Sequence, residues 1–190
     1  MEMKALAEGP AMHVRAVDPD AELVEAARAD PQAFVALYDR YFERILGYAR
    51  LRIRDAATCE DVTSQVFTTA LAQIGRFRGQ GSFAGWLFQI ARNTVHDIHR
   101  QRITEPLSEG RAAVQPTLEE RVLERERAEE LHALIRRLTP GQQHLLALRY
   151  GAGMSFTEIA SILDSAPGTV RVRMHRVLEE LRRRYSHGEG

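Results

Sequence analysis

The sequence predicts an all-α protein made of two small helical domains joined by a flexible linker. Apolar residues recur at spacings of three and four over residues 21–102 and again over residues 118–186, as they do along one side of a helix. Runs in which β-branched and polar residues alternate, which would predict strands, are lacking. Residues 103–117 contain two prolines, one glycine and few long apolar side chains, a composition typical of a linker.

The charges are balanced in number but uneven in position. Lys+Arg and Asp+Glu both number 26 in 190 residues, which argues against a polycation that coats nucleic acid. Residues 167–185 nevertheless carry six arginines and two glutamates, whereas residues 103–130 carry four arginines and eight glutamates. A locally basic segment on a neutral protein suits a DNA reader within a larger assembly, because it has little long-range attraction of its own.

Several classes of protein are disfavoured by what the chain lacks. Its single cysteine, Cys59, cannot form an internal disulfide, so we expect a buried structural thiol and no metal site or cofactor. No apolar run reaches the roughly 18 residues of a membrane span, and the N-terminus lacks the apolar core of a signal peptide. We therefore expect an intracellular protein without membrane insertion, whose residues 1–20 form a loose tail.

Three helices are expected in the first domain. The first opens at Asp30-Pro31, the second spans about Cys59 to Ile74, and the third is capped by Ser82 and runs through Gln101. The apolar positions expected to face the core are Phe34, Leu37, Tyr38, Tyr41, Ile45, Leu46, Val62, Val66, Phe67, Ala70, Leu71, Leu87, Ile90, Ala91, Val95 and Ile98.

The third helix also has a polar face that suits nucleic acid. Hydrogen-bonding and cationic side chains recur on it at spacings of three or four, namely Gln89, Arg92, Asn93, His96 and Arg100. Aromatic residues lie beside them, at Phe77, Phe83, Trp86 and Phe88. Unpaired bases stack on rings while cations hold phosphates, so this face suits a single strand. The same aromatic residues are explained equally well as core.

The second helix has an acidic edge, with Glu60, Asp61 and Gln65 beside Val66 and Phe67. Such an edge suits docking of a basic protein surface, although most faces of this kind are only solvated.

The second domain ends in two helices joined by a turn. Residues 139–142 supply a cap, a first-turn proline and a capping-box glutamine for a preceding helix that ends at residues 151–153. Ser155 and Glu158 form the next capping box, and residues 165–168 break that helix. The last helix has one apolar stripe, formed by Val170, Met174, Val177, Leu178 and Leu181.

Turned away from the apolar stripe of the last helix are Thr169, Arg171, Val172, His175 and Arg176. A short helix, a turn and a basic second helix outline a helix-turn-helix, whose second helix enters the major groove of DNA. The alternative is an ordinary helical hairpin with a solvated basic face.

Together these segments resemble the extracytoplasmic-function (ECF) class of bacterial sigma factors, in order as well as in motif. The family's first core helix is similar to DPQAFVALYDRYFERILGYA, and its acidic, polymerase-gripping helix to EDVTSQVFTTALAQIGRFRG. Its promoter-melting helix, usually SF-x-x-WL-x-x-IA-x-N-x-x-x-D, is similar to SFAGWLFQIARNTVHDIHRQR. Its C-terminal helix-turn-helix domain is similar to LTPGQQHLLALRYGAGMSFTEIASILDSAPGTVRVRMHRVLEELR.

The resemblance implies a function for each domain. Residues 21–102 would be sigma region 2, which binds core RNA polymerase and opens the minus-ten promoter element. Residues 118–186 would be sigma region 4, which reads the minus-thirty-five element as duplex. It further implies a cytoplasmic specificity subunit that is not an enzyme, has no small-molecule substrate and is controlled by an anti-sigma factor.

The resemblance also implies roles by position. Asn93 would contact a flipped base of the non-template strand, in a pocket walled by Phe77 and Ile90. Nearby phosphates or bases would be held by Arg92, His96 and Arg100. The minus-thirty-five duplex would be contacted by Arg149, Thr169, Arg171, Val172, Arg173, His175 and Arg176. The polymerase would be faced by Asp61, Gln65, Val66 and Phe67.

Two departures and two alternatives accompany this interpretation. Val172 replaces a small polar residue of the family, and His175 is unusual, so the duplex sequence read is expected to be idiosyncratic.

A stand-alone helix-turn-helix regulator would instead bind duplex DNA without polymerase. A nucleic-acid-processing enzyme lacks support, because the sequence shows no carboxylate cluster, P-loop or nucleophile arrangement. A flexible linker predicts weak promoter binding by the free protein.

Overall fold

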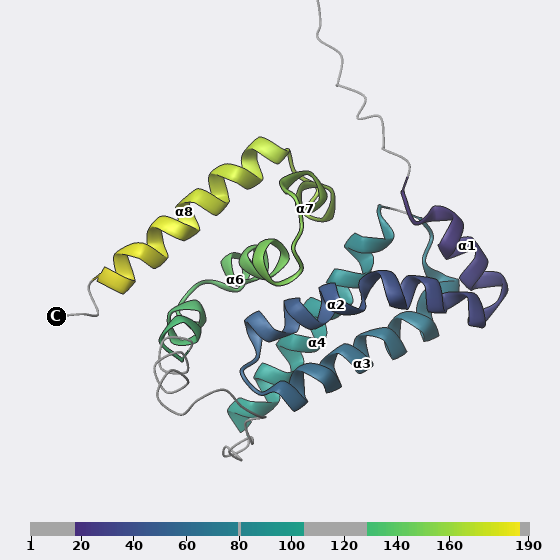
Figure 1. The fold of residues 1–190 in the computed structure, drawn as a ribbon, viewed down its shortest axis with the longest axis horizontal. Helices are drawn as coiled ribbons and strands as arrows, with labels where there is room; N and C mark the ends of the chain where they lie inside the picture. The colour runs from purple at the N-terminus through teal and green to yellow at the C-terminus, as the bar shows by residue number, and fades with distance from the viewer. Residues whose placement is uncertain (1–17, 80, 105–128, 187–190) are drawn as a thin grey trace, which may run out of the picture.

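A computed structural model describes residues 18–79, 81–104 and 129–186, with side chains of residues 101–104 left aside (Figure 1). Every regular element in these ranges is helical, which confirms the predicted all-α class. Residues 1–17 of the expected tail and the expected linker beyond residue 104 lie outside the described residues. The expected tail is too long by residues 18–20, because Asp18 accepts from the Phe83 N–H at 2.7 Å and buried Asp20 accepts from the Tyr41 hydroxyl. No helix in the described ranges is long and apolar enough to cross a membrane.

The first domain consists of α1 (Ala21–Ala29), α2 (Phe34–Arg52), α3 (Ala56–Gln73) and α4 (Phe83–Thr104). Each helix packs against the next, and α4 also contacts α2 (Figure 1). The expected opening at Asp30-Pro31 is a short 3-10 turn, Pro31–Ala33, that leads into α2. Side chains cap the starts: Asp55 accepts from the Thr58 N–H at 2.8 Å, and Ser82 from the Gly85 N–H at 3.1 Å.

The core of the first domain follows the predicted apolar positions with two exceptions. Leu71 and Tyr38, which we expected to face inward, are 42% and 38% exposed. Ala70, one position before Leu71, is fully buried, so α3 turns that side toward its neighbours. Cys59 is buried as expected, and its thiol donates to the Ile53 carbonyl at 3.5 Å.

The second domain contains a helical stretch at residues 129–136, then α6 (Pro140–Leu146), a wide turn Ala147–Gly151, α7 (Phe156–Ile162) and α8 (Pro167–Ser186). Both predicted capping boxes are confirmed, at Thr139 with Gln142 and at Ser155 with Glu158. α7 ends at Ile162 and α8 begins at Pro167, so the break between them lies two residues earlier than expected. Of the α8 stripe, Val170, Met174 and Val177 are buried and Leu178 and Leu181 half-buried.

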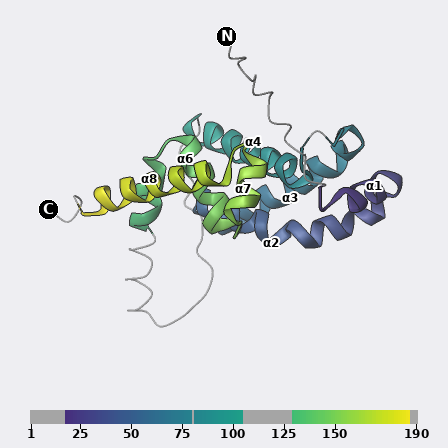
Figure 2. The same ribbon diagram turned by 90° about the horizontal axis from the view of Figure 1, so that it is seen from above.

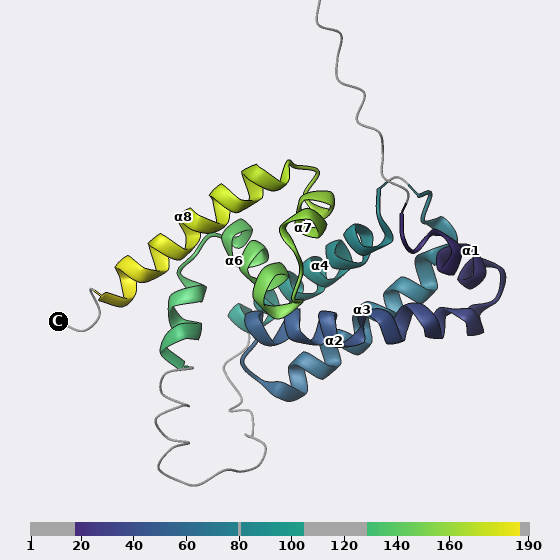
Figure 3. The same ribbon diagram turned by 45° about the horizontal axis from the view of Figure 1, so that its top comes forward.

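The two domains pack against each other, which the expectation of a flexible linker did not anticipate. Figures 1 and 3 show α6 and α7 between α8 and the first domain, and Figure 2 shows the same contact from above. α2 packs on the turn Ala147–Gly151 and α4 on α7, so one hydrophobic core runs through both domains.

A pair of glycines permits this contact. A Cβ added to Gly47 would lie 2.1 Å from the Gly151 carbonyl oxygen, so the two backbones touch directly. Around them, the Tyr48 hydroxyl and His144 Nδ1 are hydrogen-bonded at 2.8 Å, and Arg44 Nε donates to the Ala152 carbonyl at 3.3 Å. Arg44 also pairs with Glu158 at 2.6 Å.

Candidate nucleic-acid interface

α4 has the two faces that the sequence predicts. Leu87, Phe88, Ala91 and Val95 are fully buried. The opposite side chains, Gln89, Arg92, Asn93, His96 and Arg100, are all exposed. Gln89 Nε2 donates to Asn93 Oδ1 at 2.9 Å, which orients the Asn93 amide on the surface.

Asn93 and Ile90 line a groove between α3 and α4. Its volume is about 570 Å³, and it is bordered by Asp61, Val62, Gln65, Thr69, Gln73, Ile90, Asn93, Thr94, Asp97 and Ile98. The structure thus brings the predicted base-contacting residues beside Asp61 and Gln65, the exposed members of the predicted polymerase face.

Phe77 is not among the residues of this groove. It is 7% exposed, with its ring centroid 5.2 Å from that of Trp86 and 6.1 Å from that of Phe83. The Arg28 guanidinium lies 6.0 Å from the same ring. In this arrangement Phe77 belongs to the core, which corrects the expectation that it walls a pocket with Ile90.

The predicted polymerase face is divided by burial. Asp61 and Gln65 are exposed, whereas Val66 and Phe67 are 0% and 4% exposed. The helical repeat places Val66 and Phe67 on the side of α3 that carries Val62, where Phe67 packs its ring edge-on against Phe34 at 6.4 Å. A buried side chain offers no docking surface, so the expectation is corrected for these two residues.

Arg92 lies apart from the groove, where the two domains meet. Behind it, Arg52 is buried and donates to the Tyr48 hydroxyl at 3.1 Å. Burial and the charges of Arg92 and Arg52 lower the pKa of His144 to about 4, so its ring is neutral near neutral pH. Burial likewise raises the pKa of Tyr48 to about 12. The Tyr48–His144 hydrogen bond therefore joins two neutral groups.

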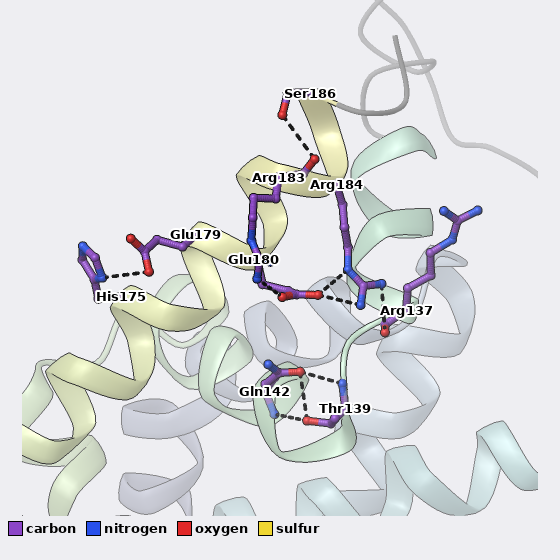
Figure 4. A network of polar contacts seen from close by, with 9 residues as sticks. All are labelled: Arg137, Thr139, Gln142, His175, Glu179, Glu180, Arg183, Arg184 and Ser186. Atoms are coloured by element: carbon purple, nitrogen blue, oxygen red, sulfur yellow. Dashed lines mark hydrogen bonds and ion pairs between the residues drawn. The ribbon is translucent and has the colours of Figure 1, made fainter. Parts of the chain in front are cut away.

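The basic face of α8 is exposed as predicted. Thr169, Arg171, Val172, Arg173, His175 and Arg176 are all exposed. Val172, an apolar residue within this face, is 52% exposed. His175 Nδ1 lies 3.4 Å from Glu179, an ion pair when the imidazole is protonated (Figure 4).

Some arginines of this domain already have partners. Arg149 is half-buried, donates to the Met154 carbonyl at 2.7 Å and lies 4.8 Å from the Phe156 ring, so it braces the turn before α7. Arg171 lies 5.5 Å from the same ring and remains exposed. Near the end of α8, Arg183 and Arg184 pair with Glu180, and Arg184 also donates to the Arg137 carbonyl (Figure 4).

The contact between the domains escaped the sequence analysis. Its clearest local signal is Gly47, an isolated glycine inside a helical pattern. Glycine costs a helix interior about 1 kcal/mol relative to alanine, so such a residue indicates close approach of another backbone. Nothing local points from Gly47 to its partner Gly151.

Comparison with known proteins places both domains in described families. Residues 37–103 match Sigma-70 region 2, and residues 128–181 match Sigma-70, region 4. Among curated relatives, the ECF RNA polymerase sigma factor BldN of Streptomyces coelicolor is 37% identical over 169 residues, which are 85% of this chain and 64% of BldN. The RNA polymerase sigma-H factor of Pseudomonas aeruginosa is 32% identical over 179 residues, 86% of this chain and 92% of that protein.

Solved structures share the fold. CnrH, in complex with the cytosolic domain of CnrY, matches with a TM-score of 0.65 at 22% identity over 90% of this chain and 99% of CnrH. The sigma factor RpoE, in complex with the anti-sigma factor NepR from Bartonella quintana, matches with a TM-score of 0.55 at 19% identity over 79% of this chain and 94% of RpoE.

Proposed function

Because the chain belongs to the ECF class of the sigma-70 family of RNA polymerase sigma factors, we propose that it binds core RNA polymerase and directs promoter-specific initiation. The observation that carries this function is the coincidence of the two family matches with the two exposed faces. The region 2 match contains the polar face of α4, and the region 4 match contains the basic face of α8.

The first domain would open the minus-ten element. Asn93, beside half-buried Ile90, would receive a flipped base of the non-template strand, while Arg92, His96 and Arg100 would hold phosphates. An amide supports this role because it both donates to and accepts from a base edge, and this one is exposed above a groove.

The second domain would read the minus-thirty-five element as duplex. Arg171, Arg173 and Arg176 would engage base edges and phosphates, since the planar guanidinium can meet guanine at two points. Exposed Val172 would contact a thymine methyl group, and Thr169, His175 and Arg149 would lie at the edge of the interface.

Asp61 and Gln65 would form the contact with the polymerase, because they are exposed on α3 next to the base-contacting groove. We also propose control by an anti-sigma factor, which would cover such faces. The chain would act in the cytoplasm as a transcription regulator with no enzymatic activity of its own.

The test is run-off transcription with purified core polymerase on a genomic fragment library, with transcript starts sequenced. We expect starts that share two upstream elements and that are lost with Asn93→Ala or Arg171→Ala. Arg50→Ala, an exposed arginine on α2 outside both faces, is the matched control and should leave transcription intact.

A stand-alone helix-turn-helix regulator is the competing function. Tight duplex binding by the free protein, without stimulation of core polymerase or binding to it, would favour that alternative and reject the sigma role.

A further inference from the structure

A second pocket lies at the junction of the two domains. Its volume is about 410 Å³, and its lining comprises Arg92 of α4, Thr139, Gly141, Gln142, His144, Leu145 and Leu163, and Arg173, Arg176 and Val177 of α8. We call it the arginine pocket. It exists only while the domains are in contact, because its cations come from both.

The charge of the arginine pocket is uncompensated within the described part of the chain. Arg92, Arg173 and Arg176 line it, no carboxylate does, and none of the three makes an ion pair with another described residue. The other end of α8 differs, since Arg183 and Arg184 there share Glu180 (Figure 4).

A buried cation, Arg52, lies outside the lining of the arginine pocket but interacts electrostatically with Arg92. The pKa of Arg52 is lowered by burial and by the charge of Arg92, which places the two guanidinium groups within electrostatic reach. Arg52 Nε has no hydrogen-bond partner among the described residues. Like charges gathered at one site repel one another, so the site favours an anion that would relieve the repulsion.

The lining also indicates what kind of anion would fit. Arginine forks engage phosphate oxygens at two points, with charge-assisted hydrogen bonds. Beside them, half-buried Leu163 offers apolar surface of the kind that contacts a base or sugar. The volume is within the range of pockets for small organic ligands, roughly 300–1,000 Å³.

We propose that the arginine pocket binds a phosphate-bearing small molecule of nucleotide size, and that this ligand holds the two domains together. A ligand that binds only the closed arrangement stabilises that arrangement by its binding free energy. Arg92, Arg173 and Arg176 are also proposed DNA contacts, so the ligand would compete with promoter DNA. Only this competition rests on the proposed sigma function; the binding site itself does not.

The experiment is isothermal titration calorimetry of the full chain with ATP, GTP and inorganic tripolyphosphate, in about 0.1 M salt to limit non-specific attraction. We expect one ligand per chain. Arg92→Ala and Arg173→Ala, in different domains, should each weaken binding about tenfold or more, the loss expected for one charge-assisted contact. Arg171→Ala is the matched control, because it removes an exposed arginine of α8 outside the pocket.

A second variant tests whether ligand binding requires contact between the two domains. Gly47→Ala removes no charge but obstructs the contact with Gly151, so it should abolish binding. Gly168→Ala, where an added Cβ meets nothing within 4 Å, should leave binding unchanged. Circular dichroism checks that each variant is folded.

The outcomes of the titration distinguish the kind of ligand and can overturn the proposal. Tighter binding of ATP or GTP than of tripolyphosphate supports a nucleotide, whereas equal binding supports recognition of the phosphates alone. No binding, equal weakening by Arg171→Ala and Arg173→Ala, or full binding by folded Gly47→Ala would overturn the proposal. The titration contains neither polymerase nor DNA, so its failure leaves the sigma function standing, and failure of run-off transcription leaves the pocket standing.

Discussion

A single methyl group at Gly47 is predicted to separate the two domains while leaving each folded. In Gly47→Ala the new Cβ would lie 2.1 Å from the Gly151 carbonyl oxygen, and because real Cβ contacts essentially never fall below 3.0 Å, the gap has to widen by at least 0.9 Å. The obstructing atom belongs to the backbone, so no side-chain rotation can relieve the clash.

The size of this displacement decides which contacts survive. Tyr48 follows Gly47 directly, and its hydroxyl lies 2.8 Å from His144 Nδ1, so the same displacement stretches this pair to about 3.7 Å, beyond hydrogen-bonding distance. Its loss costs about 1 kcal/mol, and the partly exposed Arg44–Glu158 pair adds at most about 1 kcal/mol. Within α2 itself, alanine is more favourable than glycine by about 1 kcal/mol. The first domain should therefore be no less stable, and only the contact between the domains should be lost.

Small-angle X-ray scattering and thermal unfolding by circular dichroism test this prediction together. We expect a larger radius of gyration, unchanged helix content and two resolved unfolding transitions for Gly47→Ala. Gly168→Ala should match the unsubstituted protein in all three. An unchanged radius of gyration with one transition would refute the inference that these glycines hold the domains in contact.

Three further predictions concern stability and its relation to function. The pKa of His144 is lowered from 6.5 to about 4, so the unfolded chain binds more protons than the folded chain between these pH values. The free energy of unfolding should therefore be unaffected by His144 above pH 6.5 and should decline as the pH falls toward 4. The free energy of unfolding, measured with urea at pH 7 and at pH 5, should differ less between the two pH values for His144→Gln than for the unsubstituted protein. An equal difference in the two proteins would contradict the assignment of this pH dependence to His144. Phe67→Ala should lower the free energy of unfolding by about 3–5 kcal/mol because Phe67 lies in the core. Asp61→Arg should weaken polymerase binding and leave the free energy of unfolding unchanged. The reverse pattern would reject the assignment of Phe67 to the core and of Asp61 to the polymerase contact. Ser155→Ala should cost about 1 kcal/mol by removing the cap on the Glu158 N–H, measured by the same unfolding assay, and no loss would show the cap to be dispensable.

Much of the fold could be predicted from sequence because its signals are local. The capping boxes at residues 139–142 and 155–158, and the exposed basic face of α8, need only neighbouring residues and the helical repeat, and all are confirmed. The order of the two motifs was enough to indicate the sigma factor class, since each motif has its own spacing within one helix or helix pair.

Burial within a helix is less local, and there the sequence was ambiguous. Val66 and Phe67 lie one position apart beside an exposed acidic edge, so the sequence is compatible with both a buried core stripe and an exposed docking surface at these residues. Their burial was settled by the packing of α3 against its neighbours, including the contact between Phe67 and Phe34. Phe77 was ambiguous for the same reason, until its contacts with Phe83 and Trp86 were seen.

The sequence by itself determined most of the helices, though not α1, together with their caps, their exposed faces and the family, because each depends on residues close together in the chain. Only the tertiary structure determined that Gly47 meets Gly151, that Tyr48 pairs with His144, and that Arg92 shares a pocket with Arg173. These partners are separated by a stretch whose composition carries no distance information. Their contact arises from the shapes of two folded surfaces, which no helical periodicity encodes.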